Sequence, residues 1–277
     1  MPELPEVETI ARGLKSSLPG IRIIDLTCHC GSALAQDAET FRSRLTGRRF
    51  TEVRRHGKYL FLMLDGGLAL AVHLRMTGQL YLASSKQGRD KHVHLEFFLD
   101  NNARRLVYRD VRKFGGFLLL NGTTPREFLA AKDLGPDALQ VRPEELLHAC
   151  RRTRRQLKAV LLDQRVLAGL GNIYTDEVLH RAGLSPLLPA GELTAEEAGE
   201  LAKTIRRVLL EAIRRKGTTL SDYRDAEQNR GGFQSFLLVY GRRGEACLRC
   251  GGSIHKIRVA GRGTYFCPHC QRAASMP

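Results

Sequence analysis

The chain has 277 residues, enough for one large domain or two medium ones with a buried core. Lysine and arginine number 44 against 29 acidic residues, which gives a formal net charge of +15. This balance favours a polyanionic partner, with nucleic acid before a membrane surface. No apolar run approaches the roughly 20 residues that span a bilayer, and the acidic opening does not resemble a secretory leader. We therefore expect a cytoplasmic protein that binds nucleic acid.

The opening residues can supply a nucleophile and two acids. If Met1 is removed, Pro2 presents a secondary amine that no internal residue can offer, and such an amine can condense with a sugar aldehyde. The apolar spacing over residues 7–14 predicts a helix, which would place Glu3 beside the amine and Glu6 one turn further along. One carboxylate could act as an acid while the other orients a sugar or a water. An ordinary surface helix with acids in its first turn remains the alternative.

Eight short segments rich in β-forming residues follow this helix. Hairpin signals, Gly66-Gly67 and Asn101-Asn102, separate two pairs of them. Several short strands at close spacing predict a β-sandwich that carries the N-terminal helix. The expected strands are 21–28, 48–55, 59–64, 68–74, 79–83, 92–99, 105–108 and 117–120.

The pattern becomes helical after residues 133–137, so we place a domain boundary there. The expected helices are 143–150, 153–163, 173–182 and 194–216. The last of these opens with a capping box from Thr194 to Glu197 and stops before Gly217. Residues 217–243 are rich in glycine and polar residues, as in a functional or disordered loop. The expected domains are 1–132, 133–226 and 227–277.

Four of the seven cysteines form two Cys-x2-Cys pairs near the C-terminus, separated by 16 residues. This spacing fits a tetrahedral four-cysteine zinc site, and with no ligand position left open the zinc would be structural. Reduced thiols without a metal are the alternative. The expected ligands are Cys247, Cys250, Cys267 and Cys270.

Two further segments suit a phosphate backbone. Residues 169–172 place glycines before a helix, so that backbone N–H groups and the side chain of Asn172 could bind an anion. A glycine turn that only joins two helices would give the same pattern. The basic run at 151–158, which includes Lys158, and the finger residue Arg262 could line the same phosphate track, although such runs are often solvated faces.

Three glycine turns of the N-terminal domain carry cations or large side chains. Met76, Arg112 and Phe114 could converge on one groove and fill the hole left by an extruded nucleotide. By composition alone, Met76 and Phe114 are more often core residues, and His73 would by default be structural. The turns lie at 56–58, 73–78 and 109–115.

These segments, in this order and over the whole chain, resemble bacterial formamidopyrimidine-DNA glycosylase. The resemblance implies an α+β multidomain fold: an N-terminal β-sandwich with a flanking helix, a helix-two-turn-helix domain and a four-cysteine zinc finger holding one zinc ion. It implies a bifunctional DNA glycosylase and abasic-site lyase of base excision repair, a monomer that acts on double-stranded DNA at the bacterial nucleoid. The matching segments are 2–8, 56–58, 73–78, 112–115, 169–174 and the finger.

The resemblance also implies roles for individual residues. Pro2 would attack C1′ of the damaged nucleotide, form a Schiff base and drive β- and δ-elimination. Glu3 would be the general acid and Glu6 its supporting carboxylate. Lys58 would contact phosphate and assist elimination, and Arg262 would complete the catalytic set by gripping phosphate at the flipped nucleotide.

DNA contacts are implied as well. Asn172 would grip phosphate, with Lys158 and His73 as further DNA-binding residues. The side chains expected to fill the vacated stack are Met76, Arg112 and Phe114.

Substrate choice within the resemblance turns on two features. The loop at 218–223 and Leu4 favour oxidised purines, namely 8-oxoguanine and formamidopyrimidines. An endonuclease VIII-like enzyme for oxidised pyrimidines and a non-catalytic lesion-binding protein are the alternatives. Val111 departs from the family, because many relatives carry proline there, and we expect a small effect on the turn.

Overall fold

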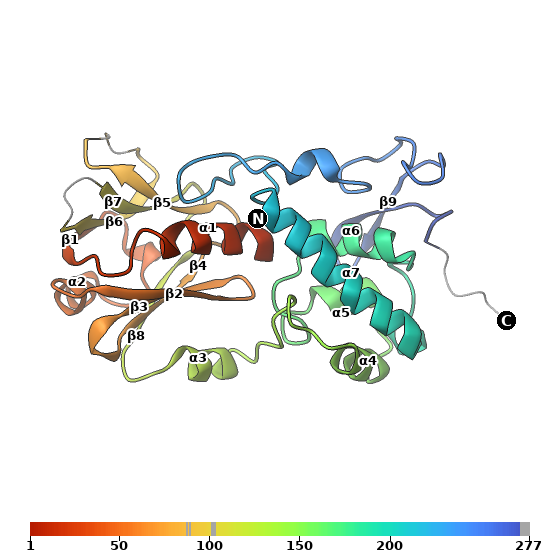
Figure 1. Ribbon diagram of the computed structural model, residues 1–277, viewed down its shortest axis with the longest axis horizontal. Coiled ribbons are helices and arrows are strands. Elements are labelled where there is room, and N and C mark those ends of the chain that lie inside the picture. Colours follow the sequence, from red (N-terminus) through yellow and green to blue (C-terminus); the bar gives the residue numbers. More distant parts are fainter. Residues whose placement is uncertain (87, 89, 101–103, 272–277) are drawn as a thin grey trace. The chain divides into compact units, whose positions relative to one another are not determined.

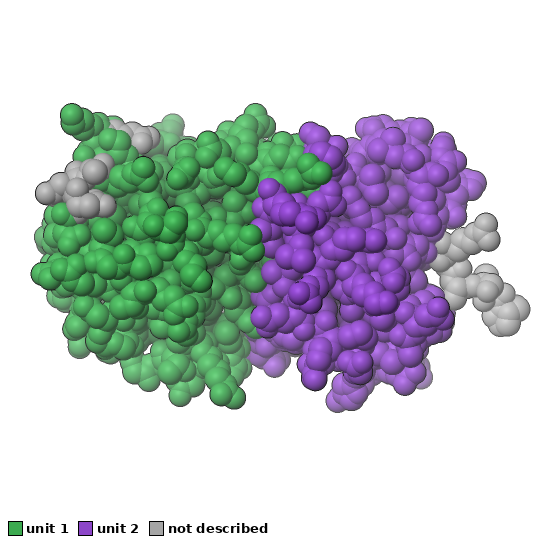
Figure 2. Space-filling view, viewed as in Figure 1, with its two compact units in different colours: residues 1–132, 215–234 green, residues 133–214, 235–277 purple. Residues whose placement is uncertain are grey.

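The computed structural model describes residues 1–86, 88, 90–100 and 104–271. The chain divides into two compact units (Figure 2). The N-terminal unit combines residues 1–132 with 215–234, and the second unit combines 133–214 with 235–277. The hairpin signal Asn101-Asn102 falls outside the described residues, whereas Gly66 and Gly67 form the expected turn, both with positive φ.

Two four-stranded antiparallel sheets form the N-terminal unit, in the orders β1-β6-β7-β5 and β2-β3-β4-β8 (Figure 1). Alternate residues of each sheet turn into one shared core, as Leu60 and Leu62 of β3 do, while Phe61 packs on the opposite face. This confirms the predicted β-sandwich. The strands are β1 (Ile23–Cys28), β2 (Phe50–His56), β3 (Tyr59–Leu64), β4 (Ala69–His73), β5 (Gly78–Ser84), β6 (Val93–Leu99), β7 (Arg104–Asp110) and β8 (Gly116–Leu120).

The opening helix α1 (Leu4–Lys15) packs into this core. Its apolar residues recur at the helical spacing, so that Val7, Ile10 and Leu14 share one buried face. Glu3 stands at the N-cap, where its N–H donates to the side chain of Glu6 at 2.8 Å. The two carboxylic acids predicted to take part in the reaction therefore also form the N-terminal cap of α1.

Strand register brings three turns to one end of the sandwich. Tyr59 at the start of β3 pairs with His73 at the end of β4, and His73 pairs with Gly116 at the start of β8. In the other sheet, Gly78 at the start of β5 pairs with Asp110 at the end of β7. The turns at 56–58, 73–78 and 110–116 therefore follow from the pairing.

Two helices of the N-terminal unit were absent from the sequence prediction. Helix α2 (Ala38–Leu45) begins where the Asp37 side chain accepts from the N–H of Thr40. Helix α3 (Pro125–Ala131) opens with a capping box between Thr124 and Glu127.

The second unit holds four α-helices among its described residues: α4 (Pro143–Arg151), α5 (Leu157–Leu162), α6 (Asn172–Ala182) and α7 (Ala195–Arg214). Helix α5 is shorter than the predicted 153–163. The backbone before it is extended, because Gln156 forms a bridge with Pro189 and the N–H of Leu157 donates to Leu188. Among the described residues, no helix combines the length and apolarity needed to cross a membrane.

Helix α7 begins and ends as predicted, with reciprocal hydrogen bonds between Thr194 and Glu197 and a positive φ at Gly217. The segment after it, predicted to be a functional or disordered loop, belongs to the N-terminal unit through residue 234. Tyr223 and Ala226 from this segment lie in the sandwich core. The second unit then ends in a two-stranded hairpin, β9 (His255–Val259) and β10 (Arg262–Phe266).

Candidate catalytic and DNA-binding site

The N-terminal carboxylates form a fixed network with the segment that follows α7. Glu3 and Glu6 are both buried, and so is Pro2. One oxygen of Glu6 accepts from the N–H of Glu3, and the other accepts from the N–H of Thr218 at 2.7 Å. The hydroxyl of Tyr223 donates to the backbone carbonyl of Glu6 at 3.4 Å. Glu6 therefore ties the N-terminal end of α1 to the loop at 218–223.

Lys58 and His73 lie at the turn end of the second sheet. Lys58 is only 8% exposed, on the tight turn between β2 and β3. Burial, with the positive charges of Arg75 and Lys58 added, lowers the pKa of His73 to about 3, so the ring is neutral. Its Nδ1 accepts from the N–H of Arg75 at 2.9 Å, which places the ring hydrogen on Nε2. His73 can therefore donate to a phosphate oxygen through Nε2.

A buried carboxylate, Asp110, organises the turn at 110–116. It is fully buried, and the hydroxyl of Thr77 also donates to it, so two neighbouring turns share one acceptor. Burial acts to raise the pKa of Asp110, but the hydrogen bonds outweigh it and the net shift is downward. The other donors to its two oxygens are the hydroxyl of Tyr108 and the N–H groups of Arg112, Phe114 and Gly115, at 2.9–3.1 Å.

The side chains predicted to fill a vacated base stack project from these two turns. Met76 is 40% exposed and Phe114 is 55% exposed, so neither is a core residue. The guanidinium carbon of Arg112 lies 4.7 Å from the ring centroid of Phe114, within the range of a cation–π contact. Exposed apolar side chains held on a rigid turn suit insertion between bases.

In the second unit, the N-terminus of α6 meets the β9–β10 hairpin. The side-chain amide of Asn172 donates from Nδ2 to the backbone carbonyl of Gly263 at 2.8 Å. Its second Nδ2 hydrogen stays available to another acceptor. Arg262, the neighbour of Gly263, is exposed at the start of β10. Asn172 thus contacts the residue that follows Arg262 in β10, and the phosphate contacts of Asn172 and Arg262 stay predictions.

Lys158 does not fit the predicted phosphate contact. It is fully buried in α5, and its Nζ lies 2.7 Å from Asp176 of α6 and 2.8 Å from the hydroxyl of Thr264 in β10. An ammonium enclosed this way is unavailable to DNA, so the structure contradicts that prediction. Asp176 also accepts from the N–H of Tyr265 at 2.9 Å. Lys158 instead joins two helices to the hairpin that carries Arg262.

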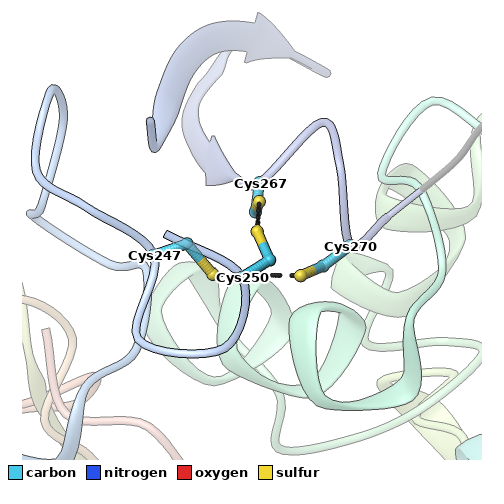
Figure 3. A group of neighbouring side chains, drawn as sticks. All are labelled: Cys247, Cys250, Cys267 and Cys270. Atoms are coloured by element: carbon cyan, nitrogen blue, oxygen red, sulfur yellow. Dashed lines mark hydrogen bonds between the residues drawn. The ribbon is translucent and has the colours of Figure 1, made fainter. Parts of the chain in front are cut away.

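The four predicted metal ligands converge in the second unit (Figure 3). All four sulfur atoms lie within 4.8 Å of one another, with Cys247 and Cys270 3.9 Å apart and Cys250 and Cys267 3.5 Å apart. Tetrahedral zinc with Zn–S bonds near 2.3 Å requires sulfur atoms about 3.8 Å apart. The donors and their spacing therefore fit one structural zinc ion.

The sequence did not predict the contacts of two sets of residues at the site. Asp110 stands in a motif whose basic and aromatic residues were singled out, while its own part as an acceptor for the turn, and for the distant Thr77, was not predicted. Similarly, Thr218 and Tyr223 were assigned to a loop over the base, and no sequence signal placed them against Glu6. For Asp110 the available clue was its position directly before the turn, where an Asp side chain commonly accepts from the backbone N–H groups that follow.

Three family models match the chain. Residues 1–117 match the formamidopyrimidine-DNA glycosylase N-terminal domain, and residues 134–224 match the H2TH domain of the same glycosylase. Residues 244–273 match the zinc finger found in FPG and IleRS.

Whole-chain relatives agree with these matches. A formamidopyrimidine-DNA glycosylase of Lactobacillus helveticus is 43% identical over 98% of this chain and 99% of its own. A Lactococcus lactis FPG mutant, solved in complex with a Fapy-dG containing DNA, is 37% identical with a TM-score of 0.92, covering 98% of this chain and 100% of that one. The wild-type Lactococcus lactis protein, solved with an oxidized pyrimidine containing DNA, is 36% identical with a TM-score of 0.91 and the same coverage.

Proposed function

The chain belongs to the formamidopyrimidine-DNA glycosylase family, and on that premise we propose that it excises oxidised purines from double-stranded DNA and then cleaves the abasic strand. Its substrates are 8-oxoguanine and formamidopyrimidines, and its place is base excision repair. The similarity to solved complexes with damaged DNA supports this proposal.

The catalytic roles are proposed for the buried N-terminal network. After removal of Met1, the Pro2 nitrogen attacks C1′ and the bond from C1′ to the base breaks. Glu3 delivers a proton as the sugar ring opens to the iminium, from which β- and then δ-elimination release the flanking phosphates. Lys58, at the neighbouring turn end, assists elimination.

One observation carries this assignment: Glu6 is held on both of its oxygens. With the N–H groups of Glu3 and Thr218 as donors, its carboxylate fixes the position of the N-terminus and of the loop at 218–223 together. We assign this loop to cover the everted base. Formation of the base pocket and alignment of the nucleophile then depend on one side chain.

DNA is held by two groups of residues. In the N-terminal unit, Met76, Arg112 and Phe114 fill the vacated stack. The phosphate contacts come from Lys58, His73, Asn172 and Arg262. Such contacts release counterions, so the logarithm of affinity should fall with the logarithm of salt by about 0.9 per phosphate bound.

The domain division at 1–132, 133–226 and 227–277 is retained as a proposal for the functional parts: catalysis, H2TH and finger. The enzyme works where chromosomal DNA lies, which places it in the bacterial cytoplasm at the nucleoid, and we propose that it acts as a monomer.

The decisive experiment is borohydride trapping on a duplex with 8-oxoguanine opposite cytosine. Wild type should give a covalent protein–DNA adduct that maps to Pro2 by mass spectrometry. P2G should give none, E3Q should trap far less, and E39Q, which changes an exposed carboxylate of α2, should match wild type. Absence of an adduct from protein with a confirmed free Pro2 would refute the mechanism.

A parallel assay distinguishes a preference for oxidised purines from a preference for oxidised pyrimidines. The Lactococcus lactis relative has been solved with an oxidised pyrimidine, so excision of thymine glycol should be compared with that of 8-oxoguanine. Faster excision of the pyrimidine would transfer the assignment to the endonuclease VIII-like class. Trapping on neither base, nor on a bare abasic site, would leave only lesion binding.

A further inference from the structure

A histidine outside the catalytic network contacts the metal centre. His180 lies in the last turn of α6 and is only 1% exposed. Its Nε2 is 3.4 Å from the sulfur of Cys247, which is itself 2% exposed. The two residues are 67 positions apart in sequence, and no spacing rule for zinc fingers includes this histidine.

The surroundings of the ring decide which nitrogen carries its hydrogen. Among the described residues, His180 Nδ1 is buried without a hydrogen-bond partner. A hydrogen on Nδ1 alone would leave a buried donor unpaired and would turn the Nε2 lone pair toward the sulfur lone pairs. A hydrogen on Nε2 replaces the repulsion by a donor–acceptor contact with the sulfur, whereas Nδ1 lacks a partner among the described residues in either tautomer. A doubly protonated ring would also carry a hydrogen on Nε2. Nε2 is therefore the donor toward Cys247.

We propose that His180 is a positioning residue for the zinc site, donating Nε2–H to the Cys247 thiolate and slowing loss of the metal. A metal-bound thiolate is an acceptor only, so it matches this donor. The backbone N–H of Arg249 donates to the same sulfur at 3.4 Å. Two N–H donors draw charge from the thiolate, which makes it less open to protonation and to exchange with other metals or chelators.

The location of His180 also relates the metal to DNA binding. Helix α6 starts at Asn172 and holds His180 eight residues later, about 12 Å further along the axis. Between them, Asp176 binds Lys158 and the hairpin. The contact with Cys247 thus fastens the far end of the helix whose first residue is assigned to phosphate.

Two substitutions separate hydrogen bonding from packing. H180F keeps a ring of similar volume but has no donor, whereas H180Q can place an amide N–H near the position of Nε2. H148F is the matched control, because His148 is exposed on α4 of the same unit. Circular dichroism of all four zinc-loaded proteins establishes that they are folded.

The readout is zinc transfer to a chromophoric chelator, followed with the full-length protein in the absence of DNA. Loss of a partner to a metal ligand typically weakens metal binding by about 10- to 100-fold. We expect H180F to release zinc about 10- to 100-fold faster than wild type, H180Q to recover most of this difference, and H148F to match wild type. Equal rates for H180F and wild type, or for H180F and H180Q, would overturn the proposal.

A spectroscopic measurement tests the bond itself. With Co²⁺ as the probe metal, removal of an N–H donor from a thiolate should shift the sulfur-to-metal charge-transfer bands of H180F to longer wavelength, and H180Q should stay near wild type. Nitrogen NMR of the zinc-loaded protein should show hydrogen on His180 Nε2. Unshifted cobalt bands in H180F, or a ring with hydrogen on Nδ1 alone, would contradict the assignment.

Discussion

Replacing Asp110 with asparagine tests whether the side chains that we assign to the vacated base stack are held in place before DNA binds. The substitution keeps the shape of the side chain and removes its charge. One oxygen of Asp110 accepts from Tyr108, Phe114 and Gly115, and the other accepts from Thr77 and the N–H of Arg112. An asparagine can accept on only one side.

The magnitude follows from these partners. With the amide oxygen on the three-donor side, the amide nitrogen faces Thr77, whose hydroxyl can rotate to accept. The N–H of Arg112 loses its acceptor on Asp110 and keeps only the hydroxyl oxygen of Thr77, at 3.1 Å, while the three bonds to the other oxygen lose charge assistance. Each charge-assisted bond contributes about 1 kcal/mol more than a neutral one, so the weakened and lost bonds together give an expected loss of about 2–4 kcal/mol of stability for D110N.

The assay pairs urea unfolding with binding to a duplex that contains a tetrahydrofuran abasic analogue. Disorder of the turn must be reversed on binding, and each 1.4 kcal/mol lowers affinity tenfold. We therefore expect D110N to bind at least roughly tenfold more weakly. D25N is the matched control, because Asp25 pairs with Arg42 on the surface, where such pairs contribute about 0–1 kcal/mol.

The pH dependence gives an independent check. The pKa of Asp110 is depressed in the folded protein, so its contribution is complete above the unfolded value near 3.9 and is lost as pH falls through the folded value. The difference between wild type and D110N should be constant from pH 5 to 8 and shrink below pH 4. If D110N matches D25N in both stability and affinity at pH 7, the organising role of Asp110 is wrong.

Three other perturbations address the rest of the site. G217A should lower both stability and base excision, because φ at Gly217 is +78° and the new Cβ would lie 2.8 Å from Glu6 Oε1. G241A is the control: its φ of +83° is similarly strained, but nothing lies within 4 Å of the new Cβ, so only stability should fall. Equal excision by the two variants would contradict the link to Glu6. K158M should cost about 3–5 kcal/mol of stability, because it leaves the buried carboxylate of Asp176 without its cation. A free energy of unfolding within 1 kcal/mol of wild type would exclude the buried ion pair. The pKa of His73 is lowered to about 3, so between pH 7 and 5 the folded ring stays neutral while the unfolded ring, with a pKa near 6.5, takes up a proton and favours unfolding. H73Q should therefore lose less stability than wild type over this range, and parallel curves would refute this.

The β-sandwich was predictable from sequence because each strand is marked by its own local pattern of β-forming residues. The strand at 59–64 was placed at its observed ends, since alternating residues such as Leu60 and Phe61 face different apolar clusters. Helix α3 was not predicted, although the sequence from Thr124 to Glu127 has the pattern of a capping box. The shortened α5 was not predictable, because its first turn is replaced by pairing with residue 189, which no local pattern reveals.

The residues of the site likewise divide into those that local sequence predicts and those that depend on tertiary packing. Four cysteines at fixed spacing identify a metal centre without a structure, because the ligand set is local to two turns. Lys158 shows the opposite case: its sequence neighbours are basic, and only Asp176 and Thr264 decide that it is buried. The contact of His180 with Cys247 depends on tertiary packing in the same way.

The N-terminal unit is discontinuous, and this has a consequence for how the protein is made. Residues 1–132 leave the ribosome more than 80 residues before 215–234, which supply Tyr223 and Ala226 to the same core. During that interval the sandwich lacks part of its apolar filling, and Glu6 lacks the N–H of Thr218. The end of the chain to which we assign the reaction is therefore synthesised first and completed late, so we expect a product truncated before residue 215 to lack a finished site.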